Sequence, residues 1–119
     1  MSNFQLFHIR ATSSRNRGKH PIGTIALFGS GDNAFATACV TSPKDNFSKA
    51  VSRRILVGRS NSGKHVVALT PSSTMSSVLN ELNLMTPLVK KLEASDVRLL
   101  DQETSFQRQK ERILFPKPE

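Results

Sequence analysis

Polar and apolar residues alternate through much of the first forty positions, a spacing that places them on opposite faces of a β-strand. Residues 3–12 alternate in this way, and we expect both faces of this strand to be partly covered. Segments 22–28 and 34–41 are also strand-like, and the glycine-containing sequence 29–33 between them predicts a hairpin with a five-residue loop. Three strands in succession indicate an antiparallel sheet.

The spacing of apolar residues then becomes helical. Ser42 suits the N-cap, Pro43 suits the first helical position, and Gly58 suits the residue that follows a helix. These signals predict a basic amphipathic helix between Ser42 and Gly58. Lys49 and Arg53 would point away from the core. The apolar positions at helical spacing, which would face the core, are Phe47, Ala50, Val51 and Ile55.

The second half of the chain predicts two short helices between two strands. A β-branched run at 65–70 suits a central strand, apolar residues at helical spacing mark a helix over 71–83, and Thr86 caps a further helix. Two adjacent helices also permit a helix-turn-helix interpretation, which the small number of cations on the second helix weakens. Segment 97–100 is a short apolar strand. The charged C-terminal segment 101–119 opens with an edge element or a solvated helix.

These elements, in the order β-β-β-α-β-α-α-β, predict an α+β fold with a small, mostly antiparallel sheet and helices packed on one face. The length suits a single domain over residues 1–119, and 37% apolar residues imply a modest core. The only cysteine, Cys39, excludes an internal disulfide. No apolar run approaches the roughly 20 residues that cross a bilayer, and no hydrophobic signal core opens the chain, so we expect a cytoplasmic location.

Positive charge is concentrated in the first half of the chain. Seventeen Lys and Arg residues against nine Asp and Glu residues give a formal charge of +8. Residues 1–64 hold ten of the basic and two of the acidic residues, whereas the rest is balanced. Segment 13–21 is basic and has no periodicity, which predicts a basic loop. Such an excess favours anionic partners, of which nucleic acid and an acidic protein surface are the main classes. Solubility alone is the alternative use of the charge.

Residues 58–64 match the pattern G-x-x-x-x-G-K and follow a short apolar segment, 55–57. This sequence resembles the phosphate-binding loop of small GTPases, including ribosome-assembly GTPases with the sequence G-R-S-N-x-G-K-S. The resemblance implies that backbone amides would hold phosphates and that Lys64 would reach the β and γ oxygens. Three departures oppose it: His65 replaces the Ser or Thr that binds Mg²⁺, a strand-like run follows instead of a helix, and only 55 residues remain. Nucleotide binding through Gly58–Lys64 is therefore a remote alternative.

A second resemblance covers the predicted basic helix. Asp45-x-Phe47 opens it and Gly-Arg at 58–59 ends it before a strand. This arrangement is similar to that of small uncharacterised proteins encoded by bacteriophages and plasmids, although Ser52-Arg53 stands where Gly-Arg is expected. The resemblance implies an origin in a mobile genetic element and carries no activity with it.

The residue types of common active sites are present without an arrangement that suggests a site. His8, His20 and His65 are widely spaced, Cys39 stands alone, and no acidic cluster accompanies them. No motif pairs a nucleophilic serine or cysteine with a histidine. We therefore expect no metal, no cofactor and no enzymatic activity.

Our first hypothesis is a non-enzymatic nucleic-acid-binding protein whose basic helix and basic loops contact the phosphates of DNA or RNA. The alternative is a small phage-type inhibitor or adaptor that binds an acidic surface of a host protein. Either protein could act as a homo-oligomer, because an edge strand or the alanine-rich strand could pair across a two-fold axis. The expected contact residues are Arg15, Arg17, Lys19, Lys49, Arg53, Arg54, Arg59 and Lys64.

Several phenylalanines lie in the same half of the chain as these cations. Some sheet-type proteins that bind single strands stack bases on exposed phenylalanines, whereas the phenylalanines of a small domain more often form its core. We expect Phe47 in the core. For Phe7, Phe28 and Phe35 we favour the core and leave base stacking open.

Overall fold

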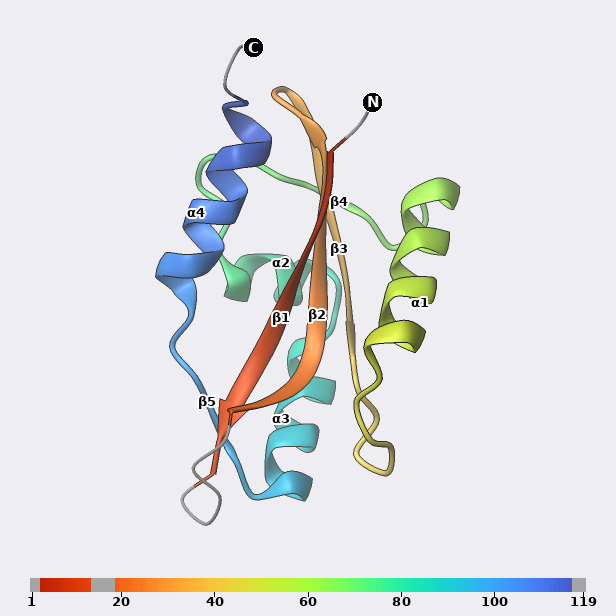
Figure 1. The fold of residues 1–119 in the computed structure, drawn as a ribbon, viewed down its shortest axis with the longest axis vertical. Coiled ribbons are helices and arrows are strands. Elements are labelled where there is room, and N and C mark those ends of the chain that lie inside the picture. The colour runs from red at the N-terminus through yellow and green to blue at the C-terminus, as the bar shows by residue number, and fades with distance from the viewer. Residues whose placement is uncertain (1–2, 14–18, 117–119) are drawn as a thin grey trace.

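The computed structural model describes residues 3–13 and 19–116, which form a five-stranded antiparallel sheet and four helices (Figure 1). The predicted α+β fold is confirmed. The elements are β1 (Asn3–Thr12), β2 (Lys19–Ser30), β3 (Asn33–Val40), α1 (Lys49–Ser62), β4 (Val67–Ala68), α2 (Met75–Glu81), α3 (Met85–Ser95), β5 (Arg98–Leu99) and α4 (Glu103–Leu114).

The three long strands form a continuous meander in the middle of the sheet, whose strand order is β4-β3-β2-β1-β5. The β2–β3 hairpin is tighter than the predicted five-residue loop, because β2 continues to Ser30 and β3 already begins at Asn33. Gly31 and Asp32 make the turn, and the Gly31 amide donates a hydrogen bond to the Ile113 carbonyl at 2.9 Å. This bond ties the hairpin to the end of α4.

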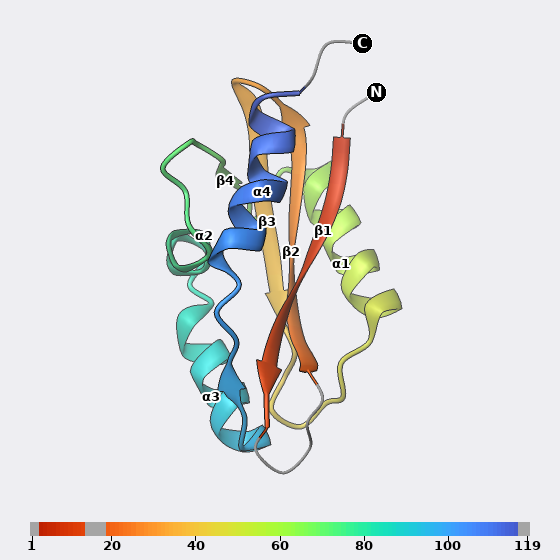
Figure 2. The same ribbon diagram turned by 60° about the vertical axis from the view of Figure 1, so that its left-hand side comes forward.

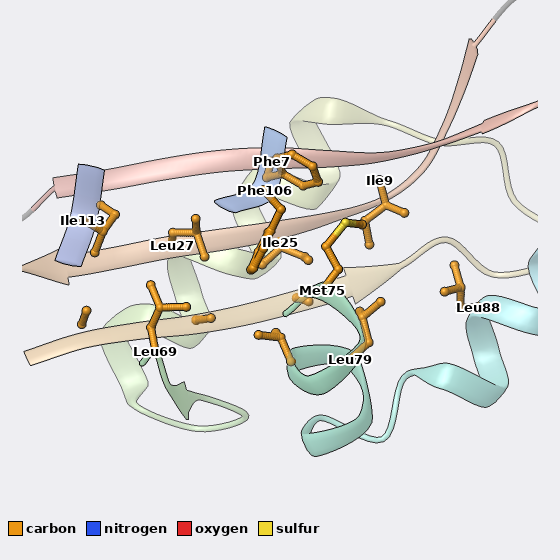
Figure 3. Close-up of a cluster of buried hydrophobic side chains, with 14 of the residues drawn as sticks. Phe7, Ile9, Ile25, Leu27, Leu69, Met75, Leu79, Leu88, Phe106 and Ile113 are labelled. Atoms are coloured by element: carbon orange, nitrogen blue, oxygen red, sulfur yellow. The ribbon is translucent and has the colours of Figure 1, made fainter. Parts of the chain in front are cut away.

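The hydrophobic core lies on one face of the sheet, under α2, α3 and α4 (Figure 3). Strand alternation supplies the sheet side of this core, and the ring of Phe7 meets the ring of Phe106 edge-on with 5.6 Å between centroids. Within the predicted helix 71–83, the structure forms α2 over Met75–Glu81, and three of its apolar residues at helical spacing, Met75, Val78 and Leu79, are buried. On α3, Leu88 is buried but Val89 is 45% exposed.

Several elements in the second half of the chain differ from their predicted extents. β4 covers only Val67–Ala68 rather than the predicted run 65–70. α3 begins at Met85, so Thr86 lies inside the helix and does not cap it. The C-terminal segment forms the helix α4, and this helix is not solvated all round because Phe106 and Ile113 are fully buried.

The basic helix α1 begins six residues later than its caps predicted. The Ser48 side chain, not that of Ser42, caps it by accepting a hydrogen bond from the Val51 amide. Gly63, with a φ of 70°, ends it, and Gly58 lies within it. Residues Ser42 and Asp45 instead form part of a turn whose carbonyl oxygens accept hydrogen bonds from the buried Lys91 ammonium group, at 3.1 and 2.7 Å. That long-range contact competes with helix formation at the predicted start.

Helix α1 packs on the sheet face opposite α2, α3 and α4 (Figure 2), so the prediction that the helices pack on one face is wrong for α1. Alternation along β3 places Ala38 in the core and Cys39 on the opposite face, where its thiol contacts the Ser52 hydroxyl of α1. The predicted inward face of this helix is wrong. Ser52 and Leu56 are its buried residues, whereas Val51 and Ile55 are 48% and 40% exposed.

None of the helices within residues 3–13 and 19–116 combines the length and apolar character needed to cross a membrane.

Candidate nucleic-acid interface

Helix α1 carries a group of exposed cations along the sheet face that it partly covers. Lys49, Arg53 and Arg54 are all exposed. Because residues four apart lie on one side of a helix, Lys49 and Arg53 point the same way, and Arg54 projects further outward. Within the described part of the chain, no hydrogen bond or ion pair engages the side chain of Lys49 or Arg54. These two charges are available to a ligand.

Arg59 has a different environment from the other α1 cations. Its guanidinium donates a hydrogen bond to the carbonyl oxygen of Ala38, at the outer edge of β3, and the side chain is half-buried. Arg59 therefore anchors α1 to the sheet. Lys64 follows the end of the helix and is exposed.

The predicted basic loop 13–21 lies mostly outside the described residues. Arg15 and Arg17 are among the residues not described, and so is the side chain of Lys19, although its backbone starts β2. The contact set that the structure can place is therefore the one on and just after α1.

The segment that resembles a phosphate-binding loop is helical for most of its length. Residues 58–62 belong to α1, and the Gly63 amide closes the helix by donating to the Arg59 carbonyl at 2.9 Å. Arg59 to Ser62 are therefore helical and lie beyond the helix end that Gly58 was expected to mark. Amides committed to helical hydrogen bonds cannot converge on a phosphate in the manner of that loop.

A row of three phenylalanines crosses the same sheet face as α1. Phe4 of β1 is paired with Phe28 of β2, and Phe28 is paired with Phe35 of β3. The ring centroids are 6.4 Å apart in the first pair and 5.9 Å in the second, with interplanar angles of 34° and 31°. Phe35 is 37% exposed, and Phe4 and Phe28 are partly exposed. We call these three residues the aromatic row.

The aromatic row lies against the cations of α1. The Arg53 guanidinium carbon is 6.0 Å from the centroid of the Phe4 ring, which is a cation–π distance. Phe7, by contrast, is 5% exposed and belongs to the core on the other face. Strand alternation alone separates Phe4 from Phe7, but recognising the row also requires the register of three strands.

At the other end of this face, His8 contacts Phe47, which precedes α1. The two rings meet edge-on at 5.7 Å between centroids, and His8 Nδ1 is 3.0 Å from the Thr24 hydroxyl. Burial lowers the pKa of His8, and the nearby charges of Lys49 and Arg10 lower it further. Arg10 lies between Ile9 and Ala11, which face the core, so strand alternation places it on this same surface, although we did not predict it as a contact residue.

Cys39 and the metal-ligating residue types are the remaining candidates for a reactive site among the described residues. Burial raises the pKa of the Cys39 thiol despite the Ser52 contact, so the nucleophilic thiolate is scarce at neutral pH. Among the described residues, no group of three or more His, Cys, Asp or Glu side chains gathers closely enough to hold a metal ion.

Comparisons with protein-family models, with curated proteins and with solved structures gave no match.

Proposed function

We propose that this chain is a non-enzymatic nucleic-acid-binding protein that contacts phosphates with the cations of α1. The observation that carries the proposal is the exposure of Lys49, Arg53 and Arg54 on one helix that borders an open sheet face. Exposed cations without an acidic partner attract a polyanion and release its condensed counterions on binding. Lys64 and the basic segment 13–21 are further contacts in this proposal.

The test is binding of fluorescently labelled DNA and RNA oligonucleotides, measured by anisotropy at several salt concentrations between about 50 and about 200 mM. We expect the logarithm of the association constant to fall linearly with the logarithm of the salt concentration. The double variant Lys49→Gln/Arg54→Gln should lower that slope by about 1.5 units, because each lost phosphate contact removes about 0.7–0.9.

The matched control is Arg108→Gln/Arg112→Gln, which changes the net charge equally. Both arginines are exposed on α4, on the opposite side of the sheet from α1. The control should keep the slope of the unchanged protein. Equal losses in the two variants would mean that net charge alone drives binding, and the assignment of α1 would then be wrong.

A second candidate, docking on an acidic protein surface, rests on a different observation. Val51 and Ile55 are exposed on α1 and line a hollow of about 480 Å³ between this helix and the end of β3. Exposed aliphatic side chains beside cations fit a protein partner better than a phosphate backbone. Val51→Ser/Ile55→Ser should leave oligonucleotide binding unchanged under the first proposal. Weaker binding of a partner protein by this variant, with intact oligonucleotide binding, would favour the second candidate.

A further inference from the structure

The aromatic row is incompletely buried although the chain has a core: Phe35 is 37% exposed, and Phe4 and Phe28 are partly exposed. The core cluster on the opposite face is complete without Phe4, Phe28 or Phe35. Helix α1 covers the row's own face only partly, since Ser52 and Leu56 are its buried side chains. Leaving these three neighbouring rings incompletely buried forgoes part of the free energy of burying them, and a ligand that covered them would recover it.

The rings have the arrangement of a stacking surface rather than of an isolated exposed residue. Direct cross-strand pairing holds all three on one side of the most regular part of the sheet. Adjacent rings are inclined by only 31–34° to each other, so their faces are presented in similar directions. Rigid strands also fix the rings before a ligand arrives, which reduces the entropy lost on binding.

The row is combined with positive charge at a distance suited to a nucleotide. Arg53 lies over Phe4, and Lys49 lies one helical turn before it on the same side of α1. A base stacked on the row would therefore have a phosphate-binding cation beside it. Aromatic faces next to cations are the combination with which sheet surfaces hold unpaired nucleotides.

We propose that the aromatic row stacks unpaired bases, so that the ligand of this surface is single-stranded nucleic acid. The inference rests on the proposed function and adds the substrate class to it. A duplex keeps its bases paired and stacked inside, and it therefore cannot use the row, although its phosphates can still meet the α1 cations. DNA and RNA share the base faces and phosphates on which this recognition depends.

The first experiment compares two substitutions at the most exposed ring. Phe35→Leu keeps an apolar side chain but removes the aromatic face, whereas Phe35→Trp enlarges that face. The probes are labelled oligothymidine and oligouridine of about twelve nucleotides, an abasic strand with the same number of phosphates, and a duplex. We expect Phe35→Leu to bind oligothymidine and oligouridine about tenfold more weakly and the abasic strand and duplex unchanged. Phe35→Trp should retain the binding of all four probes.

The second experiment observes stacking directly. The chain contains no tryptophan and no tyrosine, so Trp at position 35 is a single fluorophore. Oligothymidine should quench its emission, and the abasic strand should bind without quenching it. Circular dichroism and melting of both variants check that each is folded, which the 37% exposure of Phe35 leads us to expect.

The outcomes separate this inference from the function on which it rests. Unquenched emission, or equal weakening of abasic and base-bearing strands by Phe35→Leu, would overturn stacking. If Lys49→Gln/Arg54→Gln still lowered the salt slope in that case, phosphate binding would stand without it. If none of the probes bound to the unchanged protein at about 50 mM salt, the proposed function and this inference would both fail.

Discussion

Lys110 lies on the buried side of α4, and its ammonium group donates hydrogen bonds to the carbonyl oxygens of Pro71 and Ser73, at 2.7 and 2.8 Å. Gln107 also donates to the Ser73 carbonyl, and Glu103 accepts from the Met75 amide at the start of α2. A stripe of polar residues on α4 thus holds the turn before α2 in place. In the sequence the same stripe is indistinguishable from a solvated helix face.

Lys110→Met should therefore destabilise the fold although methionine fills a similar volume. The Lys110 side chain is 2% exposed, and the substitution leaves the Pro71 carbonyl without its hydrogen-bond donor. We expect a loss of about 1–3 kcal/mol in the free energy of unfolding, measured by urea titration. The control Lys90→Met, at an exposed position on α3, should change it by less than about 0.5 kcal/mol. Equal effects at the two positions would contradict the role given to Lys110.

His8 makes stability depend on pH in a definite direction. Its folded pKa is lowered, so the unfolded chain takes up a proton first as the pH falls. Stability is therefore lost as pH falls through the ordinary histidine pKa of about 6.5, down to the lower folded pKa. His8→Gln should reduce the fall in Tm between about pH 7.5 and about pH 5, while His20 and His65 remain in both proteins. An identical fall in the two proteins would show that His8 does not contribute.

At the scale of the element, α1 provides the clearest test of where a helix begins. The Ser48 hydroxyl accepts from the Val51 amide at 3.3 Å, whereas Ser42 lies in the preceding turn. Ser48→Ala should cost about 1 kcal/mol of unfolding free energy, and Ser42→Ala should cost little. Chemical denaturation of both variants measures the difference. A larger loss of stability in Ser42→Ala than in Ser48→Ala would indicate that Ser42 caps the helix, as the sequence predicted.

Gly58 tests the other end of the same helix. It lies inside α1 without a positive φ, and a Cβ built there has no neighbouring heavy atom within 4 Å. Gly58→Ala should stabilise the protein by about 0.5–1 kcal/mol, seen as a rise in Tm. Gly29→Ala is the contrasting case, because its φ is +90° and its Cβ would lie 2.0 Å from the Asn33 carbonyl oxygen. A destabilising Gly58→Ala would mean that the helix ends before this residue.

Strands were easier to predict than the register of α1, for a physical reason. In β1, alternate residues point to two faces of the sheet that have different surroundings, so the sequence pattern shows which residues share a face. Phe7 and Ile9 do face the core. On α1 the hydrophobic residues mark the exposed side of the helix rather than the buried one, since Ser52 is buried while Val51 and Ile55 are exposed. The turn at Ser42 depends on Lys91, a residue distant in the chain, so local caps cannot reveal it.

At the scale of the whole molecule, the sequence located the charge of the candidate site but not its aromatic part. Exposure of Lys49 and Arg54 follows from their charge, because an ionised side chain is costly to bury. The aromatic row depends on which residues of β1, β2 and β3 stand opposite each other, and pairing across three strands sets that register. Whether Phe35 is exposed or buried can therefore be predicted only once the pairing of all three strands is known.

The sheet and α1 differ in how much of each is buried and hydrogen-bonded to other elements, so we expect them to open as two separate cooperative units. β2 is bonded along both edges and faces the core, whereas α1 rests on the opposite face with Ser52 and Leu56 as its buried residues. In native-state hydrogen exchange, we expect amides of α1 to exchange through local opening and those of β2 only through global unfolding. The cations of the proposed nucleic-acid surface therefore lie on the less stable element, whereas its aromatic row lies on the sheet. A bound strand should slow exchange in α1 more than in the core.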